Sequence, residues 1–161
     1  MPDGIAVGEL GGRPVAAVSR FIGPFQLWDL ASDVLIDTPV TDAIEVGERV
    51  QGFVQVGAKP VLLTCRGHEV RVRDLESGEA SLLDPDDLEL VSALAVREGR
   101  IPLVAVARED ARVRVFDLRT GTAVDEQTLP YAATALAWAP SGDLIVGYRR
   151  TLLRCEIANR S

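Results

Sequence analysis

Arginine is the residue type whose spacing most directly suggests a binding chemistry in this chain of 161 residues. Four apolar runs each end in an arginine, at intervals of 46, 42 and 41 residues: Arg20, Arg66, Arg108 and Arg149. Guanidinium groups bind carboxylates and phosphates through paired hydrogen bonds, so a row of equivalent arginines suits an acidic partner. In the alternative interpretation, each arginine pairs with an acid of its own or the next repeat, such as Glu45, Glu48, Asp86, Asp87 or Glu109.

Other chemistries lack the residues they need. The one histidine, His68, lies in a predicted turn, and two cysteines cannot form a four-thiolate site. The segment Asp84-Pro85-Asp86-Asp87 lacks the glycine and the terminal glutamate of a calcium loop, so we predict a solvated loop. We therefore expect no catalytic residues, no metal site and no cofactor.

The amino-acid composition disfavours some classes of binding partner. Twenty-four acidic and 17 basic side chains give a formal charge of −7, which disfavours nucleic acid and anionic membranes as partners. A hydrophobic share of 47% is typical of a globular protein, and no run has the length of a membrane span. The sequence shows no signal peptide, and Cys65 and Cys155 suit a reducing compartment, so a cytoplasmic location is expected.

A second repeated landmark defines the elements that position these residues. Asp29, Asp74 and Asp117 recur at intervals of 45 and 43 residues, each within a predicted strand-exit turn. Between turn residues, the third repeat shows short period-two segments that predict strands over 90–96, 102–108, 112–118 and 122–128. No segment has a sustained helical stripe. Each repeat therefore reads as a four-stranded antiparallel meander, with helix content near nil.

Several segments resemble the WD-repeat family, in the form common in actinobacteria. They are Phe25 to Leu30, Arg112 to Gly121 and Ala135 to Gly142. The resemblance implies an all-β fold: a β-propeller of about four blades over 4–37, 49–84, 89–128 and 132–157, within one repeat domain, 1–161. The last blade lacks its outer strand. The blade-motif residues, expected to be structural, are Trp28, Asp29, Asp74, Asp110 and Asp117.

The sequence departs from the family's hydrogen-bonded tetrad. The family often links a histidine before the first strand, a serine or threonine on the second, an aspartate in the next turn and a tryptophan on the third. Ser19, Thr64 and Asp110 fit such positions, but no inter-blade loop holds a histidine. Blade rigidity is therefore expected to rest on packing. The third-strand arginines 71, 73, 112 and 114 are expected to cover the blades with their aliphatic stems.

Two classes of function remain. The first is a non-catalytic protein-interaction scaffold. Its partner would be a protein, and an acidic protein is one candidate. Family members are often attached to kinase or NTPase modules, so the resemblance implies that this chain is part of a larger signalling protein, or a shortened relative of one. The second is a propeller enzyme, of lactonase or lyase type, with a central-channel site. The expected innermost strands, 5–7, 53–56, 94–96 and 136–138, offer no titratable side chain, which argues against an enzyme.

An arc of blades leaves an apolar face at each end, and such faces favour association. Three arrangements cover those faces: a closed four-bladed ring, two chains joined into one propeller, or a larger parent protein. The second and third are favoured, and the second predicts a homo-oligomer, a dimer in its simplest form, formed head to tail.

Overall fold

The computed structural model describes residues 3–20 and 22–158. These residues form fifteen strands and one short helix. They divide into two compact units, the first ending at Pro85 and the second beginning at Asp86.

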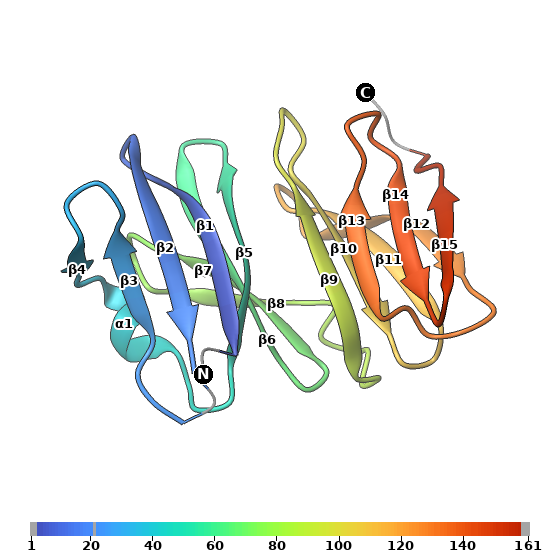
Figure 1. The fold of residues 1–161 in the computed structure, drawn as a ribbon, viewed down its shortest axis with the longest axis horizontal. Helices are drawn as coiled ribbons and strands as arrows, with labels where there is room; N and C mark the ends of the chain where they lie inside the picture. The colour runs from blue at the N-terminus through green and yellow to red at the C-terminus, as the bar shows by residue number, and fades with distance from the viewer. Residues whose placement is uncertain (1–2, 21, 159–161) are drawn as a thin grey trace. The chain divides into compact units, whose positions relative to one another are not determined.

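The first unit contains two four-stranded sheets (Figure 1). The sheet called blade 1 comprises β1 (Gly4–Leu10), β2 (Arg13–Ser19), β3 (Gln26–Asp29) and β4 (Val34–Ile36). Blade 2 comprises β5 (Arg49–Val56), β6 (Lys59–Arg66), β7 (Glu69–Asp74) and β8 (Ala80–Leu83). In both sheets the strands pair antiparallel in chain order, so each blade is a meander.

The second unit contains one four-stranded and one three-stranded sheet. Blade 3 comprises β9 (Val91–Arg97), β10 (Leu103–Arg108), β11 (Arg112–Asp117) and β12 (Thr122–Thr128). Blade 4 comprises β13 (Ala135–Trp138), β14 (Leu144–Tyr148) and β15 (Thr151–Cys155). The four predicted meanders are confirmed, with three strands in the last among the described residues, and the blade 3 strands match their expected bounds within one residue at each end.

One local feature was not predicted. Helix α1 (Pro39–Ala43) forms a single turn between blades 1 and 2, so the described residues are not wholly free of helix. Proline at the first turn suits a helix start, and the Thr38 N–H donates to Thr41 Oγ1 at 3.2 Å. The turn buries Val40 completely in the apolar core of the first unit. No helix within residues 3–20 and 22–158 has the length and apolarity needed to cross a membrane.

The inner strands of the first unit pack small side chains against large ones. Strand β1 presents Gly4, Ala6 and Gly8 toward the Val50 and Phe53 side of β5. A Cβ atom on Gly8 would lie 2.4 Å from the Phe53 ring, so a side chain there cannot be accommodated without moving Phe53. The close approach of the two strands therefore depends on glycine at position 8.

The second unit repeats this arrangement. Ala93 and Ala95 of β9 lie toward Leu136 and Trp138 of β13, and the Trp138 indole N–H donates to the Ala95 carbonyl oxygen at 3.1 Å. In each unit, the first inner strand in chain order (β1 or β9) contributes small residues to the contact. The second (β5 or β13) contributes large residues. The packed core behind them includes Leu103, Val115, Leu144 and Val146, all completely buried.

The inner strands of blades 1 and 4 each carry exposed residues on one face. On β1, Ile5 and Val7 point away from β5 and are 58% and 63% exposed. On β13, the exposed residues on the face opposite Leu136 and Trp138 are Ala135 and Ala137. We call these the large face of blade 1 and the small face of blade 4.

Candidate functional site

The recurring spacing of the strand-exit aspartates corresponds to one turn geometry. Asp29 accepts hydrogen bonds from the N–H groups of Ala31 and Ser32 at 2.9 and 3.1 Å. Asp74 accepts the equivalent pair, from Glu76 at 2.8 Å and Ser77 at 3.2 Å. Each carboxylate thus satisfies donors of the turn that ends its own strand, which accounts for an aspartate at this position without any catalytic role.

These contacts also set the protonation of the aspartates. The N–H groups of Ser32 and Ala31 hold the pKa of Asp29 below its usual value, and those of Glu76 and Ser77 do so for Asp74. For Asp117 the main cause of the lowered pKa is the Arg119 side chain, whose Nη2 lies 2.7 Å from Oδ2. All three are therefore ionised at neutral pH and unsuited to general acid catalysis.

The remaining motif residues lie at the positions that the repeats suggest. Trp28 lies on β3, opposite Ala16 of β2 and Leu35 of β4. Asp110 lies in the turn between β10 and β11, where it accepts the Arg112 N–H at 3.2 Å and pairs with the Arg112 guanidinium. Burial opposes ionisation of Asp110, but Arg112 outweighs it and lowers the pKa.

Three of the four recurring arginines are exposed. Arg20 follows β2 and Arg66 is the last residue of β6, where it pairs with Glu45, one of the acids considered as an internal partner. Arg149 follows β14, with its guanidinium carbon 3.6 Å from the centre of the Tyr131 ring. Arg149 has a positive φ of 54°, in the hairpin position that Gly67 occupies in blade 2 with a φ of 62°.

Arg108 differs from the other three because it is 2% exposed. Its Nε lies 3.2 Å from Asp87 Oδ2, and its Nη1 donates to the Glu89 carbonyl oxygen at 2.5 Å. The structure therefore gives Arg108 an internal partner in place of an external one. Asp87 is itself 8% exposed and also lies 3.0 Å from Arg112 Nη2, so the predicted solvated loop is exposed at Pro85 and Asp86 but buries Asp87.

Blade 2 contains a matching acid whose importance the sequence did not indicate. Glu48, 1% exposed, lies just before β5 and accepts from Arg73 Nε at 2.7 Å and Nη2 at 2.8 Å. Thr64 Oγ1 donates to Glu48 Oε1, and Arg71 Nη1 lies 3.4 Å from Oε2. We call Glu48, Thr64 and Arg73 the buried triad.

The buried triad occupies the positions of the family's tetrad with different residues. Glu48 lies where the histidine is expected, Thr64 is on the second strand, and Arg73 takes the third-strand position that Trp28 has in blade 1. The expectation that rigidity rests on packing alone is therefore wrong for blade 2. Arg73 and Arg71 also form ion pairs, rather than serving only as aliphatic cover, because buried acids face them.

Burial and ion pairing act in opposite directions on Glu48. Burial would raise the pKa of this carboxyl, but hydrogen bonds from Arg73 and Thr64 outweigh it, so the pKa is lowered. Glu48 is consequently a permanently charged structural group at neutral pH. A buried carboxylate with two arginines and a threonine around it stabilises the blade but offers no proton for chemistry.

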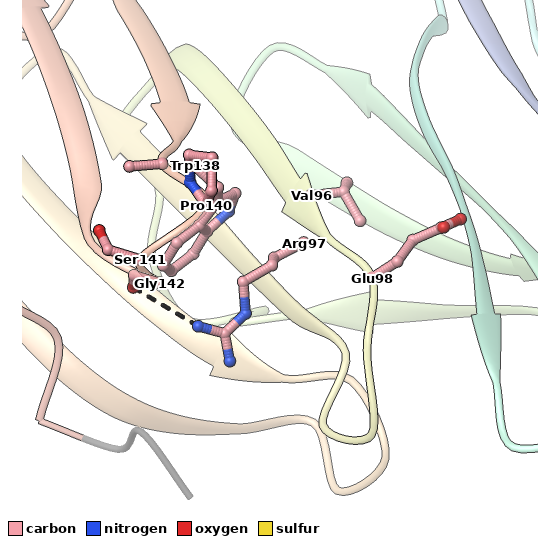
Figure 2. Close-up of a pocket in the computed structure, with 8 residues that line it drawn as sticks. Val96, Arg97, Glu98, Trp138, Pro140, Ser141 and Gly142 are labelled. Atoms are coloured by element: carbon pink, nitrogen blue, oxygen red, sulfur yellow. Dashed lines mark hydrogen bonds between the residues drawn. The ribbon is translucent and has the colours of Figure 1, made fainter.

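The second unit has an open pocket of about 690 Å³ where β9 and β13 end (Figure 2). Its lining comes from the turn after β9 and from the turn between β13 and β14: Val96, Arg97, Glu98, Trp138, Ala139, Pro140, Ser141 and Gly142. Figure 2 shows the Arg97 side chain directed toward Gly142, whereas the Glu98 carboxylate points the opposite way. The charged group that enters the pocket is thus a guanidinium.

Sequence reasoning did not identify Arg97 as a site residue. Arg97 and Trp138 meet because they end successive inner strands, 41 residues apart, which equals one repeat. A search for arginine and aromatic residues at one repeat's separation could have found the pair.

Within residues 3–20 and 22–158, no three histidine, cysteine, aspartate or glutamate side chains are placed to hold a metal ion. His68 lies in the turn between β6 and β7. Burial, with Asp125 nearby, raises the pKa of the Cys155 thiol, which makes it a poor nucleophile.

Solved structures with this architecture settle the class of fold. BBS1N, solved in complex with ARL6DN, aligns with a TM-score of 0.71 at 21% identity, over 100% of this chain and 52% of its own. The WD40 β-propeller domain of Doa1 aligns with a TM-score of 0.62 at 19% identity, over 87% of this chain and 45% of its own. The chain has a WD40-like propeller fold.

Two further similar proteins differ in how much of their own length this chain covers. The computationally designed Ika4 protein matches with a TM-score of 0.69 and 16% identity, over 98% of this chain and 92% of its own. U3 small nucleolar RNA-associated protein 21 homolog of Schizosaccharomyces pombe is 27% identical over 150 residues. The match covers 85% of this chain but only 16% of that curated relative. No family model matches.

Proposed function

We propose that this propeller is a non-catalytic protein-interaction scaffold and that a second copy of the chain is one of its partners. The supporting observation is the pair of uncovered faces, large on blade 1 and small on blade 4. Propellers present rigid loops and faces over wide areas, and binding through them requires no reactive group.

The two faces are complementary in the same sense as the packed contacts inside each unit. There, a small-residue strand receives the large residues of the strand that follows it. Ala135 and Ala137 of one copy would receive Ile5 and Val7 of another in this way. The large face extends across blade 1 to Trp28 and Leu35, the latter 51% exposed, because Val7, Ala16, Trp28 and Leu35 form one cross-strand row.

Association of this kind is head to tail, because each contact joins two different faces. Light scattering after size exclusion is expected to give a mass above 17.3 kDa, corresponding to a dimer or larger. A stable monomer at all concentrations would contradict the second copy as a partner and would favour contact between the two faces of one chain.

We further propose that acidic segments of partner proteins bind the exposed arginine turns at Arg20, Arg66 and Arg149. In Arg149 the guanidinium is held against Tyr131, and Arg150 beside it is also exposed. Neither Arg149 nor Arg150 has a carboxylate within salt-bridge distance among the described residues. The formal charge of −7 favours a protein over a nucleic acid as the ligand.

Charge reversal tests this second contact. Arg66→Glu with Arg149→Glu is expected to weaken capture of a labelled decaglutamate peptide at least fivefold at physiological salt. Arg13→Glu is the control, since Arg13 is also exposed but lies at the opposite end of its strand, in contact with Asp29. If Arg13→Glu weakened peptide capture equally, the change in net charge would explain the result. The assignment of the arginine turns as the binding site would then be overturned. The cytoplasmic location and an actinobacterial relationship remain part of this proposal, as does attachment to a larger signalling protein.

A further inference from the structure

We propose that the pocket between the ends of β9 and β13 binds a carboxylate group of a peptide, with Arg97 as the anion-binding residue. The pocket lies apart from the recurring arginine turns in the chain, because it is built from the turns after first strands. The inference rests on the proposed interaction role in one respect only, namely that the ligand is a protein segment.

Arg97 is held in place from two sides. Its guanidinium carbon lies 5.1 Å from the centre of the Trp138 ring, and its Nη1 donates to the Gly142 carbonyl oxygen at 3.4 Å. Trp138 is fixed in turn by its hydrogen bond to the Ala95 carbonyl oxygen. A guanidinium that is already oriented loses less side-chain entropy when it binds an anion.

The shape of the pocket depends on the glycine opposite Arg97. Gly142 has a φ of 87°, and a Cβ atom built there would lie 3.1 Å from Arg97 Nη1. The absence of a side chain at position 142 lets the guanidinium approach the turn closely. Pro140 and Trp138 provide an apolar wall beside it.

In the described part of the chain, no acidic side chain neutralises Arg97. Among residues 3–20 and 22–158, no carboxylate lies within salt-bridge distance of Arg97, and Glu98 points away from it in Figure 2. Its single hydrogen bond uses Nη1, so the Nε and Nη2 edge is the side on which a carboxylate can bind with two parallel hydrogen bonds. This sets Arg97 apart from Arg73, Arg108 and Arg154, each of which faces a buried acid.

Three blocked peptides distinguish the sources of a carboxylate. Ac-Gly-Glu-Glu-Gly-NH2 carries side-chain carboxylates, Ac-Gly-Gln-Gln-Gly-OH carries only the C-terminal one, and Ac-Gly-Gln-Gln-Gly-NH2 carries none. In the unaltered chain, labelled with nitrogen-15, we expect the Arg97 Nε–H and Trp138 Nε1–H resonances to shift together and saturably with one or both acidic peptides. Whichever acidic peptide binds more tightly identifies the source.

Substitution tests the role of the guanidinium. Arg97→Gln is expected to weaken binding of the better peptide at least tenfold, whereas Arg100→Gln, the same charge change in the same exposed turn, should leave it within twofold. The Arg66→Glu and Arg149→Glu variant should also bind normally, which separates this site from the arginine turns. Equal shifts with the uncharged peptide, no movement of the Arg97 resonance, or normal binding by Arg97→Gln would each overturn the proposal.

Discussion

Replacing Glu48 with alanine is expected to lower the free energy of unfolding by about 3–5 kcal/mol, because it leaves the Arg73 guanidinium buried without its partner. Arg73 is 4% exposed and both its Nε and Nη2 donate to Glu48. Urea unfolding at pH 7 measures the change. The matched control is Glu45→Ala, since Glu45 is half exposed and its pairs with Arg66 and Arg71 should contribute at most about 1 kcal/mol.

A double substitution tests the same contact when the single variant does not fold. Glu48→Leu with Arg73→Met removes both charges, and we expect it to recover most of the lost stability, as replacement of buried ion pairs by apolar side chains often does. A loss for Glu48→Ala no larger than for Glu45→Ala would contradict the account of the buried triad.

The pH dependence of stability follows from the lowered pKa of Glu48. Because the folded-state pKa lies below the usual value of 4.5, the stabilisation is present above that value and is lost as the pH falls through the folded-state pKa. Unfolding midpoints measured from pH 6 down to pH 2.5 should therefore fall more steeply in the unaltered chain than in the double variant. Asp29 and Asp74 act in the same direction in both proteins, so the comparison isolates the triad.

Val7→Glu is expected to raise the dissociation constant for self-association at least a hundredfold while leaving the fold intact. Val7 is 63% exposed within its unit, so the charge is solvated in the monomer, but it would be buried without a partner at the contact with a second copy. Ala137→Glu should have the same effect from the other face. Val46→Glu is the control, because Val46 is 69% exposed but lies in the loop before β5, outside both faces.

Mixing the two variants tests whether the contact joins different faces. A Val7→Glu chain retains its small face and an Ala137→Glu chain retains its large face, so an equimolar mixture should recover one contact and a dimeric mass. Recovery would exclude pairing of like faces. If neither variant changes the mass, the two faces do not mediate association.

The architecture was accessible from sequence because it depends on local, periodic signals. Two landmarks with nearly constant spacing, the run-ending arginines and the strand-exit aspartates, located the four meanders, and period-two segments located the strands. Helix α1 was missed because a single turn that starts at Thr38-Pro39 has too few residues to show a helical period.

The side-chain partners were less accessible, because they depend on which faces meet. The sequence placed Glu48 and Asp87 only among several acids that an arginine could contact, and nothing in their spacing showed that both would be buried. Arg108 and Arg66 share one position in the repeat, yet one faces Asp87 in the core and the other pairs with Glu45 at the surface. Repeat position thus predicts where a side chain starts but not what lies opposite it.

The number of sheets in the described residues limits how copies can combine into a closed propeller. Every chain contributes four sheets, one of them with three strands. A closed annulus built only from copies of residues 3–20 and 22–158 must therefore hold four, eight or a higher multiple of four sheets. An odd number, such as seven, requires further sheets from outside these residues, either from the same polypeptide or from a different one.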